Sequence, residues 1–136
     1  MHLLRQIFYV SRAREGLGDV EVRDILSASR RNNRRRDVTG SLMFSGAHFA
    51  QTLEGRPADL AGLLEHIALD PRHNDVRVVV DRGTTTRAFP EWSMAYVYRL
   101  DLADELDRLI GGAAIAPGDE ENLVRRFAPD SMIGEL

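Results

Sequence analysis

The chain has 136 residues, of which 43% are hydrophobic and 29% charged, a composition typical of one globular domain with its own core. It contains no cysteine, which excludes disulfide bonds, thiolate catalysis and cysteine-ligated metals. A net charge of −3 argues against a protein built around nucleic-acid phosphates, and no apolar run is long enough for a membrane span or a signal peptide, so a cytoplasmic location is expected.

The first predicted elements are a strand and a helix. Residues 3–10 are largely apolar on both faces, which indicates a strand inside a sheet. Apolar residues then recur at helical spacing and predict a helix from Gly18 or Asp19 to about Arg31. Asn32 and Asn33 follow at its expected end, because asparagine tolerates the left-handed conformation of a C-terminal cap.

Residues 37–55 predict a β-hairpin with its turn at residues 45–47. On the return strand Phe49, Gln51 and Leu53 share one face, which should be buried. Gln51 is anomalous there, because an unpaired buried amide costs about 1–3 kcal/mol. It must therefore have hydrogen-bond partners, and its neighbours in sequence supply none.

The rest of the chain completes an α+β pattern. A second helix is predicted from Arg56–Pro57 to Asp70–Pro71, a fourth strand at residues 76–80 with strict alternation of the valines, and a fifth strand at residues 92–98. The order βαββαββ predicts a ferredoxin-like fold, with a mixed five-stranded sheet and two helices on one face. Residues 99–136 should form a helical extension of two short helices, separate from a domain at residues 1–98 and covering the outer face of the sheet.

Most charged residues have an ordinary structural explanation. The run RRNNRRR at residues 30–36 is typical of a solvated helix end whose cations offset the helix dipole, with phosphate or nucleic-acid binding as the alternative. The four histidines never fall at metal-ligand spacing, so no metal site is expected. No acid/base pair or nucleotide-binding motif appears, which disfavours an enzyme.

Three polar residues resist such an explanation when they are taken together. Tyr9 and Gln51 are expected on parallel neighbouring strands, both facing the helices, and Asn33 on the first helix points to the same space. Singly, Tyr9 could be a core residue and Asn33 a cap. A phenol and two amides around an apolar slot suit a planar heterocycle with carbonyl and ring-nitrogen edges.

These residues belong to motifs that resemble the BLUF family, the blue-light sensors that use flavin. The motifs are L-x-x-I-x-Y-x-S at residues 4–11, S-x-x-N-N at 29–33, V-T-G at 38–40, F-x-Q-x-L-E-G at 49–55, D-x-R-H at 70–73 and F-x-x-W-S-M at 89–94. Six motifs in order over about residues 1–98 are far more specific than any one of them.

The resemblance implies a flavin, normally FAD, held without a covalent bond between the two helices. Gln51 would bridge the Tyr9 hydroxyl and the N5/C4 carbonyl edge of the flavin. Asn33 would hold the carbonyl and N3 edge of the ring, with Asn32 at the other carbonyl. The remaining implied binding residues would pack the ring or lie beside it and its ribityl-phosphate chain: Ile25, Phe49 and Ile67 for packing, and Ser29, Asp70, Arg72 and His73 beside it.

The resemblance also implies a photoreceptor without turnover. Under blue light Tyr9 would release an electron and a proton through Gln51, and Gln51 would be left rotated or tautomerised, with the flavin absorption moved slightly to the red. Trp92 and Met94 on the fifth strand would relay the change. Output would pass to an unidentified protein or through self-association, as a homo-oligomer, with no direct binding to nucleic acid or membrane.

Two alternatives stay open at this point. An acylphosphatase-like enzyme of the same fold would use an arginine and an asparagine in the loops, but the chain lacks a Gly-rich phosphate cradle after the first strand. An RNA-binding module would use residues 30–36, against the acidic balance of the chain.

Overall fold

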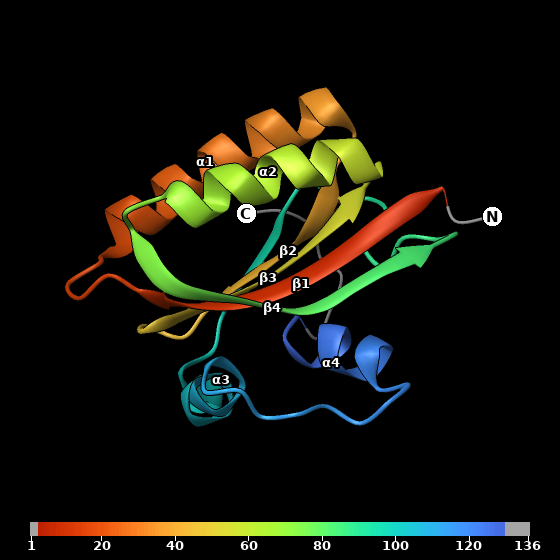
Figure 1. Ribbon diagram of the computed structural model, residues 1–136. Coiled ribbons are helices and arrows are strands. Elements are labelled where there is room, and N and C mark those ends of the chain that lie inside the picture. Colours follow the sequence, from red (N-terminus) through yellow and green to blue (C-terminus); the bar gives the residue numbers. More distant parts are fainter. Residues whose placement is uncertain (1–2, 130–136) are drawn as a thin grey trace.

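A mixed five-stranded sheet lies between two layers of helices in the computed structural model, which describes residues 3–129. The strands are β1 (Leu4–Ala13), β2 (Thr39–Phe44), β3 (His48–Gly55), β4 (His73–Thr84) and β5 (Ala95–Tyr98), in the order β4-β1-β3-β2-β5. Helices α1 (Asp19–Arg36) and α2 (Pro57–Leu69) cover one face, and α3 (Ala103–Ile110) and α4 (Glu120–Arg126) lie on the other (Figure 1). The predicted ferredoxin-like α+β fold is confirmed.

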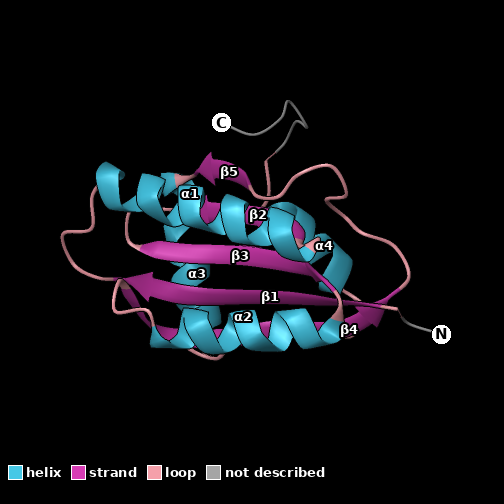
Figure 2. Cartoon of the chain, turned by 90° about the horizontal axis from the view of Figure 1, so that it is seen from above, coloured by secondary structure: helices cyan, strands magenta, loops and turns pink. Residues whose placement is uncertain are grey.

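Neighbouring strands run antiparallel, apart from the parallel pair β2–β5. The expectation that Tyr9 and Gln51 lie on parallel neighbours was wrong. Helix α1 connects β1 to β2, and α2 connects β3 to β4. The two strands of each connected pair are parallel and have one strand of the other pair between them, so β1 and β3 run in opposite directions (Figure 2). Tyr9 and Gln51 are nevertheless directly opposite each other in this antiparallel register.

Strand β4 breaks the predicted alternation of its valines. Its pairing with β1 shifts by one residue, so that Phe8 is opposite Val80 and Tyr9 is opposite Val78. Such a bulge turns the following residues to the other face. Val80 is consequently buried in the outer core, whereas Val78 is 38% exposed.

Helix α1 is longer than predicted. It continues to Arg36 and ends at Asp37, which takes the left-handed conformation with φ of 54° and donates its backbone N–H to the carbonyl of Asn33. Asn32 and Asn33 therefore lie inside the last turns of the helix, and their assignment to its end was wrong. Asn33 is 1% exposed, because it faces the sheet.

The fifth strand is shorter than predicted, because β5 begins only at Ala95. The carbonyls of Ser93 and Met94 accept hydrogen bonds from Asn33 and Arg30 side chains of α1. Trp92 and Met94 consequently lie in the segment before the strand, and placing them on it was wrong.

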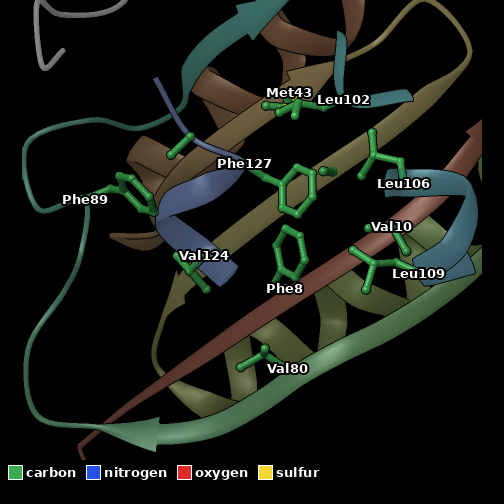
Figure 3. Packing of buried hydrophobic residues seen from close by; sticks show 12 residues of the cluster. Phe8, Val10, Met43, Val80, Phe89, Leu102, Leu106, Leu109, Val124 and Phe127 are labelled. Atoms are coloured by element: carbon green, nitrogen blue, oxygen red, sulfur yellow. The ribbon is translucent and has the colours of Figure 1, made fainter. Parts of the chain in front are cut away.

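The outer face of the sheet is covered by the C-terminal helices, as expected. Phe8 and Val10 of β1 pack there with residues of α3 and α4 and their flanks, including Leu106, Leu109 and Val124. Phe127 stacks on Phe8 with ring centroids 5.7 Å apart (Figure 3). A separate inner cluster, which includes Ile7, Leu26 and Leu60, packs under α1 and α2.

Phe127→Ala is expected to reduce the free energy of unfolding by about 3–5 kcal/mol, because it removes a fully buried ring and leaves a cavity beneath the sheet. Chemical denaturation measures this loss. Leu100→Ala is the matched control, since that side chain is 65% exposed in the same C-terminal stretch, and it should change stability by less than about 0.5 kcal/mol. Equal effects of the two substitutions would show that the extension is not part of the core.

Candidate functional site

A cavity of about 410 Å³ lies between α1, α2 and the sheet. Its volume is within the range of about 300–1,000 Å³ that small-molecule sites occupy. Every flavin-binding residue predicted from the sequence lines it, and so does Tyr9: Ile25, Ser29, Asn32, Asn33, Phe49, Gln51, Ile67, Asp70, Arg72 and His73. The fold thus brings together side chains from both helices and three strands.

Sequence reasoning missed six further lining residues. Four of them are the apolar Ala28, Leu42, Leu53 and Leu63, and two are the basic Arg36 and His66. Leu42 and Leu53 lie on the helix-facing side of their strands, so strand alternation could have indicated them. Arg36 could not be identified while the helix was expected to end at Arg31.

The floor of the cavity holds a chain of polar contacts centred on Gln51. The Tyr9 hydroxyl donates a hydrogen bond to Gln51 Oε1, and Gln51 Nε2 donates to Met94 Sδ at 3.5 Å. Gln51 and Tyr9 are 4% and 3% exposed, so both polar groups are removed from water. Gln51 thereby obtains the partners that its burial requires, and its second N–H is available to a ligand.

Tyr9 is a neutral phenol in this environment. Burial raises the pKa of its hydroxyl well above the ordinary value, and the negative charge of Asp70 adds to the shift. The hydroxyl therefore keeps its proton, which points at Gln51 Oε1.

Asn33 connects the cavity with the segment that leads into β5. Its Nδ2 donates to the carbonyl oxygen of Ser93 at 2.7 Å. An amide has a second N–H and a carbonyl oxygen, which remain for a ligand in the cavity that this residue lines. Asn32 lies beside it on the exposed side of the helix.

Asp70 and Arg72 form an ion pair where α2 ends. Arg72 donates from Nε to Asp70 Oδ1 at 2.9 Å and from Nη2 to Asp70 Oδ2 at 2.7 Å. These hydrogen bonds hold the pKa of the Asp70 carboxyl below its usual range, and they raise the pKa of Arg72. Both groups are charged and fixed in place at this end of the cavity.

His73 is oriented by two polar contacts. Its Nε2 lies 2.5 Å from the carbonyl oxygen of Ile67, and its Nδ1 lies 2.7 Å from Ser11 Oγ. Because a carbonyl only accepts, Nε2 carries a proton that points at Ile67, and Nδ1 faces the Ser11 hydroxyl. His73 also packs edge-on against Tyr9 and Phe49.

Trp92 and Met94 differ in their relation to the site. Neither of them lines the cavity. Met94 is fully buried and contacts Gln51 through its sulfur, whereas the Trp92 carbonyl accepts a hydrogen bond from the backbone N–H of Gly40. Met94 is therefore the neighbour of Gln51 in this arrangement.

The donor set fits a flavin ring. Amides of Gln51, Asn32 and Asn33 offer both donors and acceptors to carbonyl and ring-nitrogen edges, while Ile25, Phe49 and Ile67 provide apolar contact for a flat ring. Within residues 3–129, no cluster of three or more His, Asp or Glu side chains is suited to a metal ion. In the same range, no helix has the length and hydropathy to cross a membrane.

An α+β sandwich with a polar-floored cavity between its helices and its sheet is the architecture of a protein that binds a small planar ligand. The chain belongs to the BLUF family, described as sensors of blue-light using FAD, which matches residues 4–95. It is a blue-light photoreceptor that binds flavin, and this separates it from the acylphosphatase-like and RNA-binding alternatives.

Relatives and solved structures agree with this assignment. The chain is 33% identical over 92 residues to a photoactivated adenylate cyclase subunit beta of Euglena longa, and 34% identical over 86 residues to a blue light- and temperature-regulated antirepressor of Escherichia coli (strain K12). The dark-state structure of BlrB, a BLUF protein, is 36% identical with a TM-score of 0.76, and the match covers 92% of this chain and 95% of BlrB.

The matched relatives are of very different lengths. The alignments cover 67% of this chain but 11% of the Euglena cyclase, and 62% of this chain but 21% of the antirepressor. The similarity to the cyclase therefore extends to the sensor segment and carries no cyclase activity over to these residues. The ground-state structure of BlsA, at 24% identity and a TM-score of 0.76, supports the fold.

Proposed function

We propose that the chain holds FAD without a covalent bond in the cavity between α1 and α2, with Gln51 as a hydrogen-bond switch. The observation that carries the proposal is the chain of contacts from the Tyr9 hydroxyl through the Gln51 amide, which both line the cavity, to the buried Met94 sulfur. Residues 1–98 form the photosensor in this proposal and residues 99–136 an extension, of which the described part, up to residue 129, packs against the outer face of the sheet.

Bound flavin would supply absorption of blue light and an oxidising excited state. The contribution of the chain is a phenol that keeps its proton and directs it at an amide oxygen. A phenol that loses an electron becomes a strong acid, so the Tyr9 proton has a direct route to Gln51 Oε1. Asn33, Asn32 and the apolar lining residues orient the ring, and Arg72 offers a fixed cation to a phosphate.

The Gln51 amide has two unlike neighbours, which makes its two orientations unequal. In the present orientation its oxygen accepts from Tyr9 and its nitrogen donates to the Met94 sulfur. A turned amide would offer N–H to Tyr9 and place its oxygen against a sulfur that cannot donate. The turned arrangement is thus the less satisfied one on the protein side, and absorbed light supplies the energy to reach it.

Spectroscopy of the purified protein tests the proposal. The flavin bands should move to longer wavelength under blue light and return in darkness. Mass spectrometry of the flavin released on denaturation distinguishes FAD from FMN and riboflavin. Protein that binds flavin but shows no reversible shift would overturn the switch assigned to Gln51.

Asn33→Ala is expected to weaken flavin retention by about tenfold, because two hydrogen bonds to the ring at about 0.5–1.5 kcal/mol each are lost. Equilibrium dialysis or release of flavin on dilution measures the change. Asn122→Ala removes an exposed amide from α4, where it donates to Asp119, and should leave retention unchanged. Equal retention in Asn33→Ala would exclude Asn33 as a ring ligand.

Signalling to a partner completes the proposal. The C-terminal helices contact the outer face of β1 and β3 directly behind Tyr9 and Gln51, and they offer a surface to another protein or to a second copy of the chain. Size-exclusion chromatography with light scattering, in darkness and under blue light, tests the expected homo-oligomer. The cytoplasmic location expected from the sequence stays a prediction.

A further inference from the structure

Arg30 differs from the other arginines of the run at residues 30–36. Arg31, Arg34, Arg35 and Arg36 are exposed at the end of α1, although Arg34 also contacts Ser93 Oγ and Arg36 lines the cavity. Arg30 is half-buried, and its Nε donates to the carbonyl oxygen of Met94 at 3.0 Å. Arg30 therefore differs from its neighbours in that it is partly buried and holds the main chain of residue 94.

The hydrogen bond from Arg30 is one of several that hold the segment before β5, and Arg34 Nη1 also donates to Ser93 Oγ there at 3.5 Å. The Trp92 carbonyl accepts from the backbone N–H of Gly40 at 3.1 Å, and the Ser93 carbonyl accepts from Asn33 Nδ2 at 2.7 Å. Consecutive carbonyls are thus held first by β2 and then by two side chains of α1. Arg30 holds Met94, whose side chain contacts Gln51.

Anchoring of the main chain matters for Met94 because its side chain is unbranched and flexible. The position of its sulfur depends on where the Met94 backbone is held. That sulfur accepts the hydrogen bond from Gln51 Nε2, which favours the present orientation of the amide. A line of contacts therefore leads from Arg30 through the Met94 backbone to Gln51.

We propose that Arg30 is a positioning residue for the light response: it holds Met94 on α1 so that the Met94 sulfur meets the Gln51 amide. The inference rests on the proposed function of Gln51. Loss of the Arg30 contact weakens a partner of Gln51 that exists in the dark arrangement only. The light-induced state becomes relatively more stable, and its return in darkness becomes slower.

Two substitutions at Arg30 separate its hydrogen bond from its charge. The amide nitrogen of glutamine lies as many bonds from Cα as Nε of arginine, so Arg30→Gln keeps a donor in place without the charge. Arg30→Met has similar length and no donor. We expect Arg30→Met to slow dark recovery of the flavin spectrum about fivefold, because one weak hydrogen bond to Gln51 is lost, and Arg30→Gln to stay within about twofold of the parent.

Two further variants test whether the effect is specific to Arg30 and whether it acts through Met94. Arg31→Met removes the same charge from the exposed neighbour and should leave recovery unchanged. In a Met94→Ala background, Arg30→Met should have no further effect, because interaction through Met94 makes the two changes non-additive. Three outcomes would each overturn the proposal. Dark recovery in Arg30→Met could be as fast as in the parent or faster, Arg30→Gln could slow recovery as much as Arg30→Met, or the effects of Arg30→Met and Met94→Ala could be fully additive.

The single tryptophan gives a readout that does not depend on the photocycle. Trp92 is 6% exposed and lies two residues before Met94, so acrylamide quenching of its fluorescence reports the position of the segment. Quenching should increase in Arg30→Met and match the parent in Arg30→Gln and Arg31→Met. If the unmutated protein shows no reversible red shift, the proposed function is contradicted. If it shows the shift and Arg30→Met recovers in darkness at the same rate, only this inference is contradicted.

Discussion

Gln51→Leu should retain flavin and lose the reversible red shift completely. Leucine preserves the apolar contact with the ring, but it provides neither the acceptor for the Tyr9 hydroxyl nor the donor to Met94. No alternative hydrogen-bond arrangement then exists between the phenol and the ligand. Difference absorption spectra before and after blue light measure the result, and a normal photocycle in this variant would exclude Gln51 as the switch.

Gln6→Leu is the matched control for that substitution. Gln6 is a buried amide of β1, 3% exposed, that donates to Glu54 and accepts from Arg82. The same chemical change there should reduce stability and leave the light-induced shift in place, since Gln6 does not line the cavity. Tyr9→Phe provides the complementary test, because it removes the proton donor, retains the ring and should also abolish the shift.

Gly40→Ala should reduce the free energy of unfolding by about 3 kcal/mol or more, as overpacking against rigid backbone does. A Cβ added at Gly40 would lie 2.0 Å from the carbonyl oxygen of Thr52 on the neighbouring strand. Neither atom belongs to a flexible side chain, so β2 and β3 would have to separate at this point. Differential scanning calorimetry should show a decrease in Tm of about 10 °C for a chain of this size.

Gly62→Ala makes the same chemical change with the opposite expected sign. Gly62 lies in α2, and a Cβ there meets nothing within 4 Å. Alanine should stabilise the helix by about 0.5–1 kcal/mol, because glycine is a poor helix former. If both variants melt together with the parent, the close approach of β2 and β3 has no energetic weight.

The element order could be predicted from the sequence, because the apolar spacing of both long helices and the strand alternation are local signals. The ends of elements could not. Asn33 was expected to cap α1 because asparagine favours such positions, but its amide binds the Ser93 carbonyl 60 residues away and the helix continues. The same tertiary contact removes residues 92–94 from β5.

The composition of the site was more predictable than its orientation. Burial of Gln51 among apolar neighbours already indicated a need for partners, and Tyr9 supplies one in the structure. The choice of Met94 over Trp92 as the second neighbour depends on hydrogen bonds to α1 that no sequence pattern encodes. The individual roles of the lining residues in flavin binding stay predictions that the variants above can test.

The direct pairing of Tyr9 with Gln51 across β1 and β3 limits which length changes the gene can tolerate. Side chains alternate between faces, so insertion or deletion of one codon within either strand would transfer the phenol or the amide to the side of α3 and α4. Natural variation in length should therefore be confined to the connecting loops, such as residues 14–18, where the chain passes between β1 and α1.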